Sequence, residues 1–251
     1  MFKFFKRFNY SVYLLSNHIN IKRRIKHIDG LRGLAIIGVF GYHLFTEKPQ
    51  DKFLEYIFSY GNLGVNLFFL ISGFVIFLSL EKSLNYISFI KKRYFRLFPS
   101  MLFVSILYVC LFYPINEIDL IPGLTLVDPR IINFFTGLNT KAISIVFWTL
   151  FIEFQFYIIV GFSYFFLKEK TGILIGFLYL FYLGSKFFNL YFPNLIFAYF
   201  YDFGKILGLA WFSWFATGIY IYKLINTKKI FYFYLICIFT FLSALHLTAQ
   251  Y

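Results

Sequence analysis

Apolar residues along the chain form seven long runs that short polar stretches separate. The runs lie at approximately residues 28–46, 61–80, 97–115, 143–167, 173–192, 207–224 and 230–249. Each is about as long as the roughly 20 helical residues that cross the hydrocarbon core of a bilayer. An open sheet cannot satisfy its backbone hydrogen bonds in lipid. The pattern therefore predicts an all-α fold, a polytopic integral membrane helix bundle of about seven transmembrane helices.

The composition supports a lipid-embedded protein. Of the 251 residues, 60% are hydrophobic and only 14% are charged, whereas about a quarter of the residues of a soluble domain are charged. The two cysteines, Cys110 and Cys237, both lie inside apolar runs. They indicate neither a disulfide framework nor a metal site, so we expect no bound metal.

Basic residues are distributed unevenly between the two sides of the predicted bundle. Seventeen lysines and arginines fall on the side of the N-terminus, which includes the predicted loop 81–96, whereas six fall on the other side. Loops rich in Lys and Arg stay in the cytoplasm, so the N-terminus is predicted to be cytoplasmic. Residues 1–27 form a basic leader at the membrane surface, and residues 28–251 form the transmembrane domain. Anionic lipid accounts for the formal charge of +13, so we expect no nucleic-acid partner.

The first predicted span contains two ionisable residues, Arg32 and His43, which hydrocarbon disfavours. Eleven steps of an α-helix place them on one face, roughly 16 Å apart along the axis. Gly30, Gly33, Gly38 and Gly41 fall on the other face, where small residues let another helix approach closely. Arg32 extending to head groups and His43 at the interface are the alternative interpretations. Their shared face favours a functional site inside the bundle.

The fourth predicted span contains Glu153, the one acidic residue deep within an apolar run. Thr149 and Tyr157 lie four residues before and after it, which makes a polar stripe on one helix face. A carboxylate in this position requires a partner, and His43 or Arg32 are the candidates. A buried hydrogen-bonding role without catalysis is the alternative.

Four motifs occur in an order that resembles the integral-membrane acyltransferase 3 family. They read "DGLRGLAIIGVFGYHLF", "GVNLFFLISGFVIFLSL", "FIKKRYFRLFPSM" and "FWTLFIEFQFYI". The resemblance is strong over residues 28–160 and weaker beyond. It implies a bacterial cytoplasmic (inner) membrane enzyme that transfers an acyl group, usually acetyl, from cytoplasmic acyl-CoA to a hydroxyl of a surface carbohydrate. The lipid bilayer, acyl-CoA and the glycan acceptor are then the partners, with no permanently bound cofactor.

The resemblance also implies roles for individual residues. His43 corresponds to the candidate catalytic base of an Arg-x10-His pair that begins at Arg32, and Asp29 precedes this pair in the same motif. Arg93 and Arg96 match a cytoplasmic Arg-x-x-Arg-x-x-Pro element, and with Arg32 they are candidates for binding the CoA phosphates. The matches in the fourth span are Trp148, Thr149, Glu153 and Tyr157. Glu153 is the candidate acid that orients the imidazole.

Two other functions compete with this hypothesis. A transporter or flippase component would use Arg32, His43 and Glu153 as a proton or substrate pathway, but the sequence contains no inverted repeat. An inactive remnant is the second alternative, because the family usually has about ten spans and its late helices are missing from this chain. Self-association of the chain into a homo-oligomer is a way to complete such a bundle.

Overall fold

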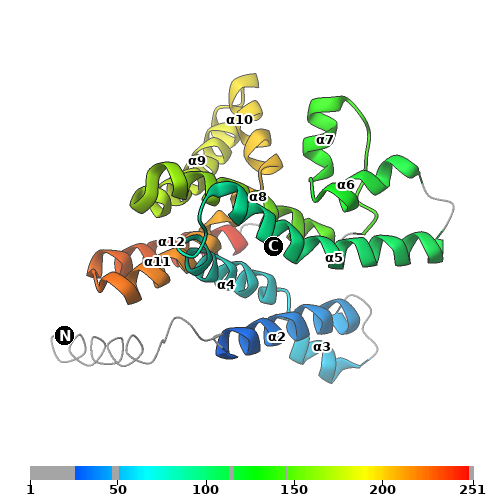
Figure 1. The fold of residues 1–251 in the computed structure, drawn as a ribbon, viewed down its shortest axis with the longest axis horizontal. Coiled ribbons are helices and arrows are strands. Elements are labelled where there is room, and N and C mark those ends of the chain that lie inside the picture. The colour runs from blue at the N-terminus through cyan, green and yellow to red at the C-terminus, as the bar shows by residue number, and fades with distance from the viewer. Residues whose placement is uncertain (1–25, 47–50, 113–115, 145, 249–251) are drawn as a thin grey trace. The chain divides into compact units, whose positions relative to one another are not determined.

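The computed structural model describes residues 26–46, 51–112, 116–144 and 146–248, and in this part of the chain the regular structure is entirely helical (Figure 1). The predicted all-α, polytopic architecture is confirmed. The helices belong to two compact units, one formed by the described residues up to Phe77 and from Trp214 onward, the other by Leu78–Ser213. The predicted leader, residues 1–27, lies almost wholly outside the described residues.

The first unit is built from α2, η1, α3, α4, α11 and α12. Their bounds are Lys26–Gly41, Tyr42–Thr46, Lys52–Phe58, Leu63–Leu80, Phe212–Thr227 and Ile230–Thr248. Helices α4 and α11 cross at a point where their backbones touch. A Cβ placed on Gly73 would lie 2.2 Å from the carbonyl oxygen of Phe215, and one on Gly218 would lie 2.0 Å from that of Leu70. Only glycine permits this crossing, as is common where membrane helices pack closely.

The second unit contains α5, η2, α6, α7, α8, η3, α9, α10 and η4. Their bounds are Tyr86–Phe112, Glu117–Asp119, Leu120–Thr125, Pro129–Thr136, Phe147–Leu167, Lys168–Lys170, Thr171–Tyr191, Leu195–Ile206 and Leu209–Trp211. Helices α5 and α8 pack antiparallel. The Tyr86 ring near the start of α5 meets Phe162 near the end of α8, whereas Tyr94 meets Phe154. The start of α5 and the end of α8 therefore lie at the same end of this unit.

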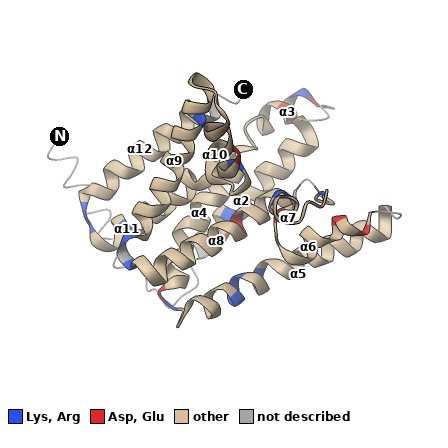
Figure 2. Ribbon diagram, turned by 90° about the horizontal axis from the view of Figure 1, so that it is seen from above, with Lys and Arg blue, Asp and Glu red and all other residues tan. Residues whose placement is uncertain are grey.

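Helix α5 begins earlier than the sequence indicates. We predicted a loop over residues 81–96 and a span from 97, but the helix already starts at Tyr86 and includes Arg93 and Arg96. The cause is a helix cap. The Oδ1 of Asn85 accepts the backbone N–H of Ser88 at 2.9 Å, and the Ser88 Oγ in turn accepts the N–H of Asn85 at 3.3 Å. Figure 2 shows that the basic residues of α5 gather in its first half.

Five helical segments of the described residues are long and apolar enough to cross a membrane. They are His27–Thr46, Lys52–Leu80, Tyr86–Phe112, Phe147–Leu167 and Thr171–Tyr191. The predicted span at 207–224 falls on α11, which qualifies only together with α10 as one broken span. The predicted span at 230–249 coincides with α12. Its apolar part, Ile230–Leu245, is shorter than the 18 residues taken as the minimum for a crossing. The count in the described chain is thus five, or six with the broken pair.

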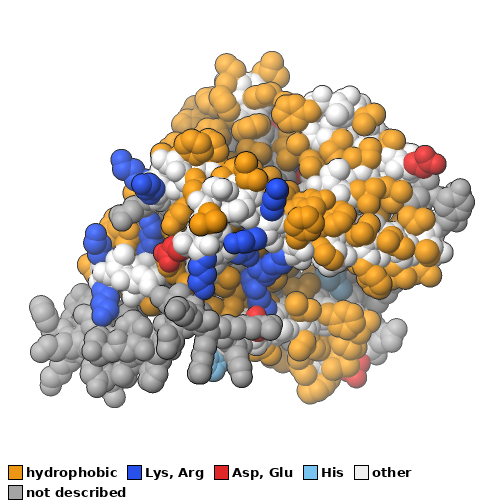
Figure 3. Space-filling model, in the orientation of Figure 1, with side chains coloured by type: hydrophobic (Ala, Val, Ile, Leu, Met, Phe, Trp, Pro, Cys, Tyr) orange, Lys and Arg blue, Asp and Glu red, His pale blue; other side chains and the backbone are white. Residues whose placement is uncertain are grey.

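The surface carries the hydrophobic side chains that a lipid environment requires. On α5 alone, Phe95, Phe103, Ile106 and Leu111 are each more than half exposed. The face in Figure 3 is dominated by hydrophobic side chains. Apolar groups would be costly on this scale in water, so the exposed surface supports the membrane assignment.

Candidate active site

His43 lies at the end of the first span in a helical turn of unusual geometry. The α-helix stops at Gly41, and Tyr42–Thr46 form a π-helical turn. The shared face of Arg32 and His43 was predicted for an uninterrupted α-helix, and the change to a π-helical turn occurs between these two residues. Isolated π-helical turns are rare and frequently occur at functional sites. The His43 side chain is exposed, and its ring meets the edge of Tyr42 at 5.6 Å between centroids.

Arg32 occupies the middle of α2 and is half-buried. Its guanidinium carbon lies 5.8 Å from the ring centre of Phe68 on α4, within the range of a cation–π contact. Asp29, three residues earlier in the first turn of α2, is exposed. Arg32 therefore faces a neighbouring helix of its own unit.

The predicted close-packing face of α2 is confirmed in its second half only. A Cβ on Gly38 would lie 3.4 Å from the carbonyl oxygen of Gly61, and one on Gly41 would lie 2.1 Å from the Phe58 ring. Nothing lies within 4 Å of such an atom on Gly30 or Gly33. The half of α2 that precedes the π-helical turn is the part held tightly against α3 and the start of α4.

Glu153 is fully buried and is held by a neighbour on its own helix. The Tyr157 hydroxyl donates a hydrogen bond to the Oε1 of Glu153. The guanidinium carbon of Arg93, from α5, lies 5.6 Å from the ring centre of Tyr157 and equally far from that of Phe89. Arg93 is itself buried. We call Arg93, Glu153 and Tyr157 the Glu153 cluster; it places a cation and an acid in the interior of one unit.

The remaining predicted residues of α5 and α8 divide into different environments. Arg96 lies one turn after Arg93 but is exposed. The Thr149 hydroxyl donates to the backbone oxygen of Val146 at 3.1 Å, so the polar stripe is confirmed for Glu153 and Tyr157, while Thr149 bonds to the backbone. Trp148 packs against a second tryptophan, Trp211, with 5.0 Å between ring centres.

The structure thus brings together Arg93, Glu153 and Tyr157. Arg96, Thr149 and Trp148 lie in other environments. Arg32 and His43 belong to the first unit, so their pairing with Glu153 stays a prediction. Sequence reasoning did not single out Asp128, Arg130 and Trp211, which line a cavity together with Trp148. The signal for the first two was present, since Asp-Pro at residues 128–129 is a strong helix start.

The helical membrane architecture and the buried acid define a multi-pass membrane protein with a polar interior site. A family model described as an acyltransferase domain, Acyl_transf_3, matches residues 25–251. The chain belongs to this acyltransferase 3 family.

Curated relatives with significant similarity include acyltransferases of two kinds. The chain is 28% identical to acyltransferase MdmB of Streptomyces mycarofaciens over 154 residues, which cover 54% of this chain and 38% of the relative. It is 32% identical to peptidoglycan O-acetyltransferase OatA of Listeria monocytogenes over 37% of this chain and 15% of the relative. It is 34% identical to O-acetyltransferase OatA of Staphylococcus aureus over 33% of this chain and 13% of the relative. The matches span well under half of each relative. No solved structure matches significantly.

Proposed function

We propose that this protein is a membrane O-acyltransferase that transfers an acyl group, typically acetyl, from cytoplasmic acyl-CoA to a hydroxyl of a surface carbohydrate. Lipopolysaccharide O-antigen and exopolysaccharide are examples of the acceptor. The observation that carries the proposal is the Glu153 cluster, a buried acid and cation inside the bundle of a chain of this family. The similarity to a protein named peptidoglycan O-acetyltransferase supports a glycan acceptor.

In the proposed reaction, His43 acts as the general base. A neutral imidazole accepts the proton of the acceptor hydroxyl while the hydroxyl oxygen attacks the thioester carbonyl. The new C–O ester bond forms, the C–S bond breaks, and the imidazolium returns its proton to the departing CoA thiolate. The exposed position of His43 on the π-helical turn leaves its ring accessible to a substrate. Glu153 would stabilise the imidazolium.

The two arginines of α5 suit different tasks. Arg96 is exposed beside Lys91 and Lys92, so its guanidinium is available to bind CoA phosphates. Arg93 is enclosed by the rings of Phe89 and Tyr157. It would therefore hold Tyr157 and Glu153 in position electrostatically, and the direct phosphate contact within this unit falls to Arg96. Arg32, in the first unit, remains a separate candidate for phosphate binding.

The antiparallel packing of α5 and α8 supports the predicted orientation within the second unit. The basic start of α5 lies at the same end as the end of α8, which is followed by Lys168 and Lys170. This end would face the cytoplasm and the acyl-CoA pool. Trp148, at the start of α8, then lies toward the opposite face of the inner membrane.

The proposal is tested with the full chain reconstituted in lipid nanodiscs, radiolabelled acetyl-CoA and a lipid-linked glycan extract as acceptor. Loss of a general base typically costs 10² to 10⁴-fold in rate, so His43→Ala should lower acyl transfer by at least about 100-fold. His27→Ala, which alters an exposed histidine at the start of the same segment, is the matched control. Activity of His43→Ala within about twofold of the parent would exclude His43 as the base.

A further inference from the structure

A cavity of about 410 Å³ lies next to the start of α8, wholly within the second unit. Its walls come from the N-cap and first residues of α7, the segment before α8, the start of α8 and the short helix η4. The lining side chains that matter here are Asp128, Arg130, Trp148, Ile152 and Trp211. The volume lies in the range of small-molecule sites, roughly 300 to 1,000 Å³, and such sites combine apolar walls with a few placed polar groups. The cavity has both.

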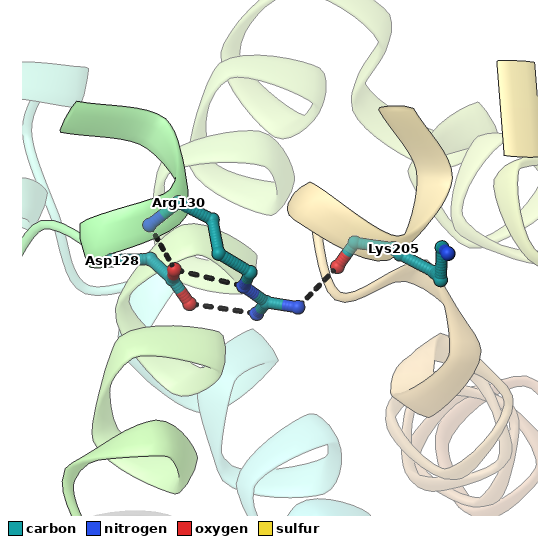
Figure 4. A network of polar contacts seen from close by, with 3 residues as sticks. All are labelled: Asp128, Arg130 and Lys205. Atoms are coloured by element: carbon teal, nitrogen blue, oxygen red, sulfur yellow. Dashed lines mark hydrogen bonds and ion pairs between the residues drawn. The ribbon is translucent and has the colours of Figure 1, made fainter. Parts of the chain in front are cut away.

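The polar groups of the cavity are an ion pair with a fixed orientation (Figure 4). The Nη2 of Arg130 lies 2.7 Å from the Oδ2 of Asp128, and its Nε donates to the Oδ1 at 2.9 Å. Arg130 also donates through Nη1 to the backbone oxygen of Lys205 at the end of α10, at 2.9 Å. The Asp128 side chain is 3% exposed, whereas that of Arg130 is 46% exposed. The pair therefore joins two elements and is preorganised toward the cavity.

Arg130 and Asp128 retain hydrogen-bonding positions that their described contacts do not use. A guanidinium has five N–H groups, and the described contacts of Arg130 use three of them. A carboxylate has about four acceptor positions, and Asp128 uses three, one of them for the backbone N–H of Arg130. Two donors and one acceptor position remain in the described structure. Adjacent hydroxyl groups, each both donor and acceptor, match such a set.

The apolar side of the cavity is aromatic. Trp148 and Trp211 are both half-buried, and their rings are inclined at 43° with centres 5.0 Å apart. An aromatic face carries partial negative charge, and the C–H groups on one face of a pyranose ring carry partial positive charge. Large flat indole surfaces beside hydroxyl-binding groups therefore suit a sugar ring.

We propose that this cavity is the acceptor subsite, where one uncharged pyranose unit of the carbohydrate stacks on Trp148 and Trp211 and donates to and accepts from Asp128 and Arg130. The inference rests on the proposed function and specifies its acceptor. An anion is a poorer occupant, because Asp128 already neutralises Arg130. A lipid acyl chain is poorer as well, because it would cover the pair and leave its remaining hydrogen-bonding positions without partners.

The position of the cavity along α8 agrees with this assignment. Trp148 precedes Glu153 by five residues and Tyr157 by nine, which corresponds to roughly 8 Å and 14 Å along the helix axis. The cavity is thus within about two and a half helical turns of the Glu153 cluster, on the side away from the basic start of α5. The predicted topology places that side away from the cytoplasm, where surface glycans are found.

The test uses the full-length Trp214→Phe variant in lipid nanodiscs, since maltoside and glucoside detergents carry sugars. The chain has three tryptophans, so this variant reports only on Trp148 and Trp211. Methyl glucoside, methyl galactoside and methyl N-acetylglucosaminide are titrated, with glucose 6-phosphate and hexanol as comparators. At least one neutral glycoside should change the emission saturably. Arg130→Lys, which keeps the charge but loses the forked geometry, should raise its Kd about tenfold. Lys186→Met on α9, which lies outside the cavity, should not alter it.

Several results would overturn the proposal. They are the absence of any response to the neutral glycosides, a response to glucose 6-phosphate or hexanol alone, and unchanged affinity in Arg130→Lys. Acetyl-CoA binding is measured on the same samples, with circular dichroism as the folding control. Loss of the glycoside response with intact acetyl-CoA binding rejects the subsite and leaves the enzyme assignment standing. Retained glycoside binding without acetyl-CoA binding rejects the proposed donor instead.

Discussion

The hydroxyl of Tyr157 donates to the carboxylate of Glu153, one helical turn earlier on α8. This contact supplies a hydrogen-bond partner to an acid that lies in the interior of a membrane helix, and Arg93 adds a cation against the Tyr157 ring. Two roles are consistent with it. Glu153 either serves only to hold the helices together, or its negative charge acts on the reaction.

Glu153→Gln separates these two roles. The glutamine oxygen still accepts the Tyr157 hydroxyl, so the hydrogen bond is kept and only the negative charge is lost. If the charge stabilises an imidazolium, kcat should fall roughly 100-fold or more. Single-turnover acyl transfer and thermal unfolding in nanodiscs measure the two effects. Glu117→Gln, at an exposed position, is the control. A fully active, stable Glu153→Gln protein would establish the purely structural role.

Arg93→Gln and Arg96→Gln should affect different kinetic parameters. Arg96 is exposed, so its loss should raise the KM for acyl-CoA about tenfold with kcat largely kept. Arg93 is buried between Phe89 and Tyr157, so its loss should lower kcat and the unfolding temperature while KM changes little. Steady-state kinetics over a range of acetyl-CoA concentrations, with Lys92→Gln as the control, resolves the two. Identical kinetic profiles for both variants would refute the division of roles.

Gly218→Ala should destabilise the first unit. The added methyl group would meet the Leu70 carbonyl oxygen at 2.0 Å, so α4 and α11 must separate. Overpacking of this kind costs about 1 to 3 kcal/mol, and a backbone neighbour cannot move aside as a side chain can. Gly184→Ala is the matched control, because nothing lies within 4 Å of its Cβ. Both unfolding temperatures are measured in nanodiscs; equal values would contradict the close crossing.

Labelling in intact cells tests the orientation. In a background without Cys110 and Cys237, Thr136→Cys should react with an impermeant maleimide from outside the cytoplasmic membrane, and Lys92→Cys should react only after permeabilisation. Both positions are exposed in the structure, so accessibility reports the side of the membrane. The reverse pattern would overturn the cytoplasmic placement of the donor side.

The sequence predicted the helical spans well where apolar length decides the outcome. Helices α8 and α9 fall close to the predicted ranges 143–167 and 173–192. It failed where short-range polar contacts override hydropathy. The Asn85–Ser88 cap begins α5 inside an expected loop. Asp128 and Pro129 likewise begin α7 between two spans, and a search for long apolar runs does not detect so short a helix.

The candidate site was likewise predictable where helix geometry is local, and was not predictable where distant segments meet. The four-residue spacing of Glu153 and Tyr157 was sufficient to predict their shared face, because helix geometry is local. The pairing of Trp148 with Trp211 joins residues 63 positions apart, and nothing in either segment specifies it. The π-helical turn at His43 was also beyond prediction, since a regular period assumes an unbroken α-helix.

The backbone crossing of α4 and α11 has a consequence for biosynthesis. Gly73 and Gly218 are separated by 145 residues (218 − 73), and the whole second unit is encoded between them. At about 5 to 20 residues per second, a ribosome needs roughly 7 to 30 s to pass from one to the other. During that interval α2 and α4 are inserted without α11. The surface of α4 that receives Phe215 therefore faces lipid or the insertion machinery until α11 is made, so the unit that carries His43 is completed only after the whole second unit has been synthesised.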